Sequence, residues 1–330
     1  MRKPLAGVAT AAVAGVLLAA AAPGSAPAAS SDSKAPVYYL SLGDSLAAGE
    51  QPTLPPGQNF GDEGYADQLY AIEHATIPNL QLVKLGCGGE STASMITAVP
   101  AVEVPGIGPV PYEGRGDHYY CSYPHRSQLA EAVNFLHAHH GFVSVVTLDI
   151  GANDLSQPGP VAGQAQIKAN LPVILAALRD AAGPDVPIIG MNYYDPFLVA
   201  WFSDPAALPA EARSAAAFNT MLESIYTAAG DPVADVATAF STTDFTLVGG
   251  IPLDVQRICQ WTWMCASPPL GPNVHPNTAG YGVIAQAFNK ALPQSASPRL
   301  PRAVASYGER SQAEFCPRSA PQDDLLSSGS

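Results

Sequence analysis

The sequence predicts a single-domain α/β protein in which a parallel sheet of about five strands lies between two layers of helices. Short, almost continuously apolar runs alternate along the chain with longer segments whose apolar residues recur at helical spacing. Strands of a parallel sheet are buried on both faces, so they appear as unbroken apolar runs, whereas a covering helix needs only one apolar face. The alternation therefore predicts a three-layer α/β/α architecture.

Five apolar runs are the expected strands. The strongest is 142–150, with the sequence FVSVVTLDI, and the weakest is 233–240, with the sequence VADVATAF. The full set of predicted strands is 37–42, 80–85, 142–150, 186–193 and 233–240.

Helical spacing marks the segments between these strands. In the last of them Asn277 is a residue type that commonly begins a helix, and Tyr281 and Phe288 recur on one face. The predicted helices are 65–74, 128–139, 165–182, 210–228 and 277–292. Residues 99–111 are interrupted by Pro and Gly, which predicts a surface loop.

The composition limits the classes of function. Of 330 residues, 47% are hydrophobic and only 13% are charged, which excludes a disordered polyelectrolyte. The formal net charge is -13, and such an acid excess disfavours nucleic acid and anionic lipid surfaces as partners, since both attract clustered Lys and Arg.

The first 29 residues have the pattern of a secretory signal peptide. Arg2 and Lys3 form a charged start, residues 5–22 are uncharged and apolar, and Ala-Pro-Ala at 26–28 places small residues where a signal peptidase cuts. The alternative is an uncleaved membrane anchor, because the apolar run approaches the length of about 20 residues that spans a bilayer. Alanine is only weakly apolar and a cleavage site follows, so we favour cleavage and a secreted protein.

The chain is therefore divided into three parts. Residues 1–29 are the signal peptide, 30–294 are the α/β domain, and 295–330 are a polar tail rich in Pro and Ser, without periodicity, which we expect to be flexible. No later stretch is apolar and long enough to span a membrane, so no permanent membrane anchor is expected.

The five cysteines suit an exported chain, in which disulfides persist. Short separation favours a bridge between Cys259 and Cys265, and Cys87 with Cys121 is the next choice, although the sequence allows other pairings. Cys316 is left over. The rival interpretation is a zinc site, but no Cys-x-x-Cys spacing or nearby His pair supports one.

The residues best suited to chemistry follow the predicted strands, where ligands of open parallel sheets bind. Gly-Asp-Ser at 43–45 follows the first strand, Gly-Cys-Gly-Gly at 86–89 the second, and Gly-Ala-Asn-Asp at 151–154 the third. His275 lies far downstream, just before the last helix. Each segment alone has an ordinary explanation as a turn, a helix cap or a structural histidine. Their combination and order are harder to explain in that way.

Together these segments resemble the GDSL/SGNH hydrolase superfamily, particularly its secreted actinobacterial lipase and esterase members. The resemblance rests on Gly-Asp-Ser at 43–45, Gly89, Gly-x-Asn-Asp at 151–154 and His275, and it extends over about 37–292. It implies a flavodoxin-like version of the three-layer fold and hydrolysis of esters without a cofactor.

The resemblance also implies a role for each residue. Ser45 is the expected nucleophile, and His275 is the base that takes its proton and returns it to the leaving alkoxide. The expected oxyanion hole consists of the backbone N–H groups of Ser45 and Gly89 and the side-chain amide of Asn153. Asp154 is expected to be a hydrogen-bonded scaffold residue rather than a catalytic acid.

One position departs from the family. Its members usually have Asp three residues before the histidine, and here that residue is Pro272. Either the backbone carbonyl of Pro272 accepts the Nδ1–H of His275, as in similar family members, or an acid such as Asp254 reaches the ring, or the enzyme is impaired. We favour the carbonyl, because it holds the tautomer that catalysis needs.

A second possible site is discounted. His137, His139 and His140 suggest a metal site, but they stand at an expected helix end, where the helix dipole favours histidine. We therefore expect no metal and no cofactor.

The prediction is a secreted serine ester hydrolase, a lipase or esterase, that cleaves a carboxylic ester of short to medium acyl chain or a lipid through an acyl-enzyme. We expect a monomer that binds an ester or lipid substrate and no nucleic acid. One alternative is a carbohydrate O-acetylesterase, although no sugar-binding module is present. The other is a non-catalytic surface protein that keeps only the fold, which the presence of Ser45, Gly89, Asn153 and His275 disfavours.

Overall fold

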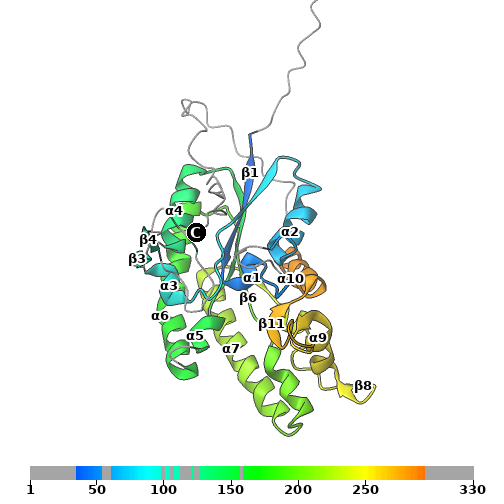
Figure 1. Cartoon of the computed structure of the whole chain (residues 1–330). Helices are drawn as coiled ribbons and strands as arrows, with labels where there is room; N and C mark the ends of the chain where they lie inside the picture. Colours follow the sequence, from blue (N-terminus) through cyan, green and yellow to red (C-terminus); the bar gives the residue numbers. More distant parts are fainter. Residues whose placement is uncertain are drawn as a thin grey trace, which may run out of the picture. The chain divides into compact units, whose positions relative to one another are not determined.

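The computed structural model (Figure 1) describes residues 35–53, 61–97, 101–104, 108–111, 121, 123, 127–156 and 159–293. The predicted signal peptide and the predicted tail lie outside these residues. The boundaries at 29 and 295, and the state of Cys316, therefore stay predictions.

The centre of the structure is a parallel sheet of five strands, as predicted. They follow the order β2-β1-β5-β6-β7, and every neighbouring pair is parallel. β1 is buried along almost its whole length, which agrees with its unbroken apolar sequence. The strands are β1 (Val37–Gly43), β2 (Leu80–Lys84), β5 (Val143–Asp149), β6 (Ile188–Met191) and β7 (Val233–Ala234).

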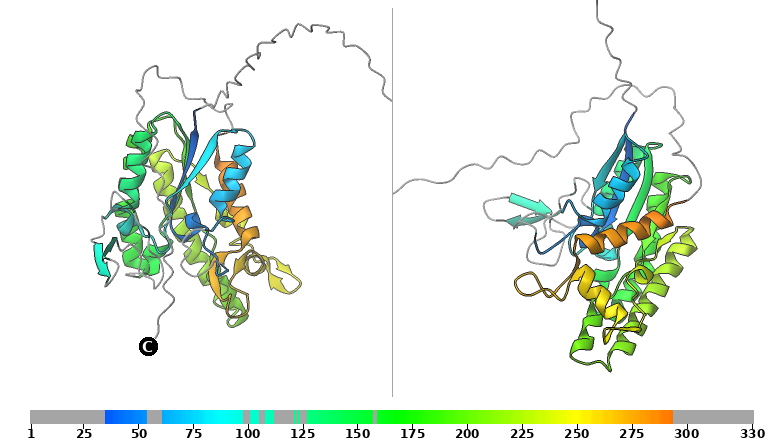
Figure 2. Two further views of the ribbon diagram at one scale, coloured as in Figure 1. Left: turned by 45° about the horizontal axis from the view of Figure 1, so that its top comes forward. Right: turned by 90° about the vertical axis from the view of Figure 1, so that its right-hand side faces the viewer.

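Helices cover both faces of this sheet, which gives the predicted three layers. Figure 1 shows α4 and α6 on one side and α2 and α10 on the other, and the left view of Figure 2 keeps the same division. α6 also contacts α7, and α2 contacts α10. These helices are α2 (Tyr65–His74), α4 (Gln128–Ala138), α6 (Pro160–Ala182), α7 (Leu208–Ala229) and α10 (Thr278–Ala291).

The last helix shows how the sequence specifies these elements. The side chain of Asn277 accepts a hydrogen bond from the Gly280 N–H and so begins α10 as predicted. Tyr281, Ile284 and Phe288 then recur on one face and are fully buried.

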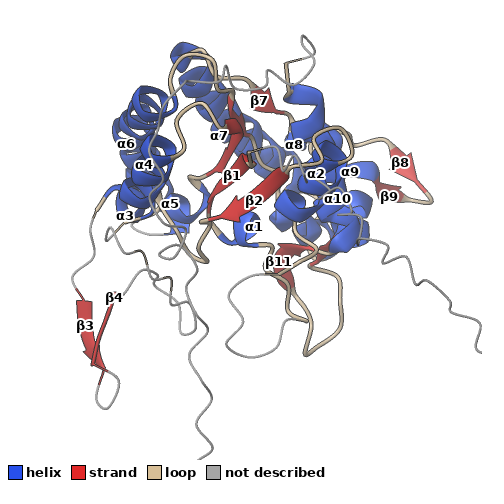
Figure 3. Cartoon of the chain, turned by 90° about the horizontal axis from the view of Figure 1, so that it is seen from above, coloured by secondary structure: helices blue, strands red, loops and turns tan. Residues whose placement is uncertain are grey.

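Shorter elements complete the structure, and the view from above in Figure 3 shows β3 with β4, and β8 with β9, lying away from the central sheet. The short helices are α1 (Ser45–Ala48), α3 (Thr92–Ile96), α5 (Ala152–Ser156), the 3-10 helix η1 (Pro196–Phe202), α8 (Val236–Ala239) and α9 (Leu253–Trp261). Three antiparallel pairs are formed by β3 (Ala101–Val104) with β4 (Gly108–Pro111), β8 (Leu247–Val248) with β9 (Ile251–Pro252), and β10 (Thr262–Trp263) with β11 (Asn273–Pro276).

Two sequence predictions are wrong. The expected loop at 99–111 contains the β3–β4 pair. The expected strand at 233–240 is only two residues long, because Asp235 accepts a hydrogen bond from the Thr238 N–H and begins α8. A residue that caps a helix ends the extended run, although the apolar residues continue.

Both expected cysteine pairs lie at disulfide distance. Cys87 pairs with Cys121, and Cys259 pairs with Cys265. None of the helices among the described residues has the length and apolar character to cross a membrane.

Candidate active site

The order of the strands brings three predicted site residues to one edge of the sheet. β1 lies between β2 and β5. Ser45 follows β1, Gly89 follows β2 and Asn153 follows β5. Because all three strands are parallel, their carboxyl ends lie side by side, and Ser45 is placed between the two other segments.

Gly43 lets the turn before Ser45 form tightly against β5. Its φ angle is +135°, and a Cβ at this position would lie 2.1 Å from the Asp149 carbonyl oxygen. The next residue, Asp44, donates its N–H to that carbonyl over 3.1 Å and accepts the Leu46 N–H at Oδ1 over 2.9 Å. Asp44 therefore caps α1, whose first residue is Ser45.

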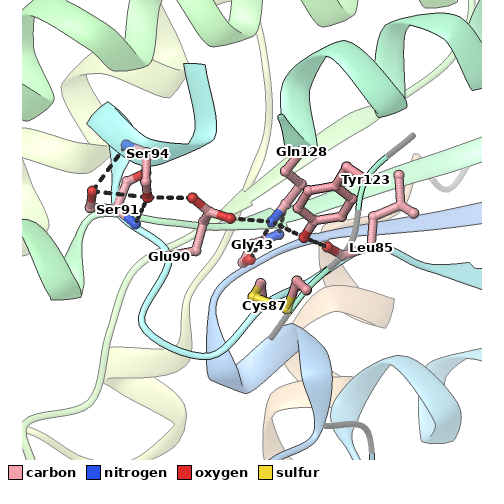
Figure 4. The surroundings of a disulfide bond; sticks show 9 residues. Gly43, Leu85, Cys87, Glu90, Ser91, Ser94, Tyr123 and Gln128 are labelled. Atoms are coloured by element: carbon pink, nitrogen blue, oxygen red, sulfur yellow. Dashed lines mark hydrogen bonds between the residues drawn. A yellow bond between two sulfur atoms is a disulfide. The ribbon is translucent and has the colours of Figure 1, made fainter. Parts of the chain in front are cut away.

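The end of β1 is also held by a side chain from α4. Gln128 accepts the Gly43 N–H at Oε1 over 2.7 Å and donates its Nε2 to the Gly43 carbonyl over 2.9 Å. The same Nε2 lies 3.1 Å from the Glu90 carboxylate and 3.2 Å from the Tyr123 hydroxyl. Figure 4 shows Gln128 at the centre of this cluster, with Cys87 beside it.

The glycine-rich turn after β2 is joined to both neighbouring segments. Cys87 donates its N–H to the Gly43 carbonyl over 3.0 Å, and Gly89 follows in a turn with φ +77°. Asn153 donates its side-chain Nδ2 to the Glu90 carbonyl over 2.9 Å. The amide of Asn153 therefore lies against the residue that follows Gly89.

Gly86 brings the same turn against α1. A Cβ at Gly86 would lie 2.4 Å from the Ala47 Cβ and 2.9 Å from the Ala48 backbone nitrogen. The backbone after β2 thus passes closer to α1 than any side chain would allow.

Asp154 has the scaffold contacts that the sequence predicted. Its carboxylate accepts the Thr92 N–H over 2.9 Å and the Thr92 hydroxyl over 2.5 Å, and it is fully buried. Asn170 donates to the same hydroxyl over 3.2 Å. Asp154 thereby joins α5 to α3.

His275 lies on β11, which contacts α1 and is drawn beside it in Figure 1. Its Nδ1 is 2.8 Å from the Oδ1 atom of Asn273, and its backbone N–H donates to the same oxygen over 2.9 Å. Since an amide oxygen that accepts the backbone N–H faces the ring, Nδ1 must carry a proton and Nε2 has the free lone pair.

The partner of Nδ1 differs from the sequence prediction. We expected the backbone carbonyl of Pro272, or an acid such as Asp254, and the structure places the Asn273 side chain there instead. Asp254 is fully buried, and its Oδ1 accepts the Val255 N–H over 2.7 Å. A side chain two residues before the histidine thus takes the place of the usual residue three before it.

A carboxyl group faces the other ring nitrogen. Oε2 of Glu50 is 3.4 Å from Nε2 of His275, and the two side chains are only 13% and 12% exposed. Burial lowers the pKa of His275 to about 4. Burial and the nearby Asp44 raise the pKa of Glu50 to about 8.

Two more carboxyl groups are buried beneath the turn before Ser45. Asp44 and Asp149 lie in contact, and the Tyr65 hydroxyl donates to Asp149. Burial raises the pKa of Asp44 to about 6, and burial together with the negative charge of Asp44 raises the pKa of Asp149. Each of these two carboxyl groups therefore keeps its proton to a higher pH than an exposed aspartate does.

Sequence reasoning missed four residues of this site. Gln128, Glu50, Asn273 and Asp149 reach it from α4, the turn after α1, β11 and β5. Only Asp149 carried a signal, because it is a charged residue inside the strongest apolar run. The described residues contain no group of three His, Cys, Asp or Glu side chains arranged to hold a metal ion.

A known protein family matches most of this domain in sequence. The model of the GDSL-like lipase/acylhydrolase family matches residues 41–283, from the end of β1 into α10. The chain belongs to the GDSL-like lipase/acylhydrolase family. The match includes Ser45, Gly89, Asn153 and His275, and it identifies the protein, at the level of the family, as an ester hydrolase.

No curated protein matches this GDSL-like chain in sequence. Among solved structures, a variant of an acetylxylan esterase from Geobacillus stearothermophilus is 15% identical, with a TM-score of 0.48, and covers 77% of this chain and 93% of its own. An extracellular lipase from Streptomyces rimosus is 18% identical, with a TM-score of 0.44, and covers 77% and 99%. The lipase Lip_vut3 from a goat rumen metagenome is 16% identical, with a TM-score of 0.46, and covers 77% and 97%.

Proposed function

We propose that this GDSL-like protein is a secreted serine hydrolase that cleaves carboxylic esters through an acyl-enzyme. Ser45 attacks the ester carbonyl, and Nε2 of His275 takes its proton and delivers it to the leaving alkoxide. Water then enters by the same route and releases the acid.

The oxyanion of each tetrahedral intermediate is held by three donors. They are the backbone N–H groups of Ser45 and Gly89 and the side-chain amide of Asn153. An amide has two N–H groups, and the bond to the Glu90 carbonyl uses one of them, so the other is left for the oxyanion. The bond to Glu90 fixes the direction in which that second group points.

One observation carries this proposal. Ser45, Gly89 and Asn153 follow three adjacent parallel strands, and the strand of His275 lies against the short helix that begins with Ser45. Residue types needed for nucleophile, base and oxyanion hole thus converge from four separate parts of the chain.

Secretion is supported by the pattern of residues 1–29 and by the two cysteine pairs at disulfide distance. One experiment tests both secretion and ester hydrolysis, and it uses protein recovered from the culture medium. Its amino-terminus is sequenced, and its hydrolysis of chromogenic esters of increasing acyl length is measured beside that of Ser45→Ala.

We expect an amino-terminus near residue 30 and a loss of about 10⁴-fold or more in kcat for Ser45→Ala, with folding unchanged. Equal rates for the two proteins would exclude Ser45 as the nucleophile. Activity confined to acetyl esters would favour the carbohydrate O-acetylesterase alternative, and a chain retained in the cell from Met1 would exclude secretion.

A further inference from the structure

The Glu50–His275 contact brings two hydrogen-bond acceptors together. The Asn273 side chain fixes the proton of the ring on Nδ1, so Nε2 of neutral His275 presents a lone pair. An ionised Glu50 also presents only lone pairs. Two such atoms at 3.4 Å, both largely buried, repel each other unless a proton lies between them.

Two hydrogen bonds hold the backbone of Glu50 in place. Its N–H donates to the Ser45 carbonyl over 3.0 Å, and its own carbonyl accepts the Tyr281 hydroxyl over 2.7 Å. The residue that faces Nε2 is therefore fixed on the same turn as the nucleophile.

We propose that Glu50 is a positioning residue that shares one proton with Nε2 of His275 and keeps this nitrogen from acting as a base until that proton is lost. The inference rests on the proposed function, in which the same nitrogen takes the proton of Ser45. On ionisation the proton leaves to solvent and the pair gains one negative charge. The carboxylate then stabilises the imidazolium that forms when Ser45 attacks.

The charges around the pair favour retention of the shared proton near neutral pH. Asp44, which caps α1, adds negative charge, Asp149 on β5 lies in contact with Asp44, and from α10 the Tyr281 hydroxyl faces the backbone of Glu50. Tyr194, ahead of η1, bonds the Val274 carbonyl beside His275. No Lys or Arg forms an ion pair with Glu50 among the residues that the structure describes.

These surroundings set the pH at which the proton is lost. Burial and Asp44 raise the pKa of Glu50 to about 8, and burial keeps His275 from holding a second proton above pH about 4. The pair titrates as a unit, so the acid limb of kcat/KM is expected near pH 8, well above the ordinary histidine pKa of about 6.5.

Two substitutions of Glu50 separate this role from a structural one. Glu50→Ala removes the shared proton, so we expect the acid limb to move below about pH 6.5 and the ratio of activity at pH 6 to that at pH 9 to rise at least about tenfold. Glu50→Gln keeps the shape and donates an N–H that cannot ionise, so we expect low activity at every pH and no limb near pH 8. At pH 6 the alanine variant is therefore the most active of the three.

A purely structural role predicts the reverse order, with glutamine closest to the wild type and the limb unmoved in both variants. That result would overturn the proposal. Glu63→Gln is the matched control, because Glu63 is exposed and its carboxylate accepts the Thr278 hydroxyl, which a glutamine oxygen can also accept. It should keep the wild-type pH profile.

An NMR titration makes the inference independent of activity. The ring-nitrogen signals of His275 are assigned by their absence from the spectrum of His275→Gln. In the Ser45→Ala protein these signals should shift with a titration step near pH 8. Adding Glu50→Ala should abolish that titration step. A titration at the ordinary pKa in both backgrounds would contradict the shared proton. If Ser45→Ala remains active while the step near pH 8 is present, the proposed nucleophile fails and the shared proton stands.

Discussion

Asn273 fixes the tautomer of the proposed base with a single oxygen. That oxygen accepts two N–H groups of His275, one from the backbone and one from the ring. The arrangement replaces an anionic partner by a neutral one, so the ring is oriented without a negative charge at Nδ1. The neighbouring charge lies on the Nε2 side, at Glu50.

Substitution of Asn273 tests this role. Asn273→Ala removes both bonds and frees the ring to adopt the other tautomer, so we expect kcat/KM to fall by about 10² to 10⁴. Asn273→Asp keeps the oxygen that accepts both N–H groups, so it should retain most of the activity. Steady-state kinetics measures kcat/KM for each variant, and circular dichroism checks that the variants are folded like the wild type. A kcat/KM of the alanine variant within threefold of the wild-type value would show that another group orients the ring.

At the level of elements, helix α4 holds the strand end from which the nucleophile emerges. Gln128 pairs with both backbone groups of Gly43 from the first turn of α4, and it also reaches Glu90 in the segment after β2. One buried amide thereby joins α4, β1 and the turn that carries Gly89. The Cys87–Cys121 disulfide lies beside this cluster (Figure 4).

Loss of that amide should weaken both folding and catalysis. Gln128→Leu keeps the volume but leaves the buried Gly43 N–H without its acceptor, so we expect the free energy of unfolding to fall by about 2 to 4 kcal/mol and kcat to fall more than KM rises. Urea unfolding and kinetics measure the two effects. Gln286→Leu, an exposed glutamine on α10, is the control and should change stability by less than about 0.5 kcal/mol. Equal effects of the two substitutions would contradict the role of Gln128.

For the whole molecule, buried acids govern how stability depends on pH. Burial raises the pKa of Asp195 to about 7. Its Oδ1 atom accepts the Phe197 N–H over 2.9 Å, and its Oδ2 atom has no hydrogen-bond partner among the described residues. The pKa values of Asp44 and Glu50 are raised as well. Because the folded state holds protons that the unfolded chain releases near pH 4, their contribution is fully present below pH 4 and is lost as pH rises through the folded pKa values.

We therefore expect the free energy of unfolding to decrease from about pH 4 to about pH 8, the range between the unfolded pKa of these acids and their folded values. His275, whose pKa is lowered, acts in the opposite direction only below its unfolded pKa of about 6.5. Asp195→Asn keeps the cap of η1 but cannot ionise, so it should flatten the decrease. Chemical denaturation at a series of pH values measures the slope, and a slope equal to that of the wild type would show that Asp195 does not titrate in this range.

The sequence predicts the sheet and the main helices well because each of them shows one dominant period. The bounds 65–74 for α2 are those found, and the apolar runs locate β1, β2 and β5 within a residue or two. The run at 233–240 fails because its apolar residues suit a strand or a helix equally, and a capping contact decides between them. α9 has mixed polarity and gave no clear period.

Some residues of the candidate site can also be predicted from the sequence, and others cannot. The sequence predicts Ser45, Gly89 and Asn153 because each follows an apolar run, and each lies after the end of that strand. Glu50, Asn273 and Gln128 are not predicted, because only folding brings their side chains to the ring or the strand end. Spacing along the chain carries no information about such tertiary contacts.

The two glycines that pack backbone against backbone have a consequence for redesign. Gly43 touches the end of β5 and Gly86 touches α1 more closely than any side chain would permit. A mutational library that randomises these positions would consist mostly of misfolded members. Diversity aimed at a new substrate belongs instead in the segments that leave the sheet, with the strand ends kept as an invariant frame.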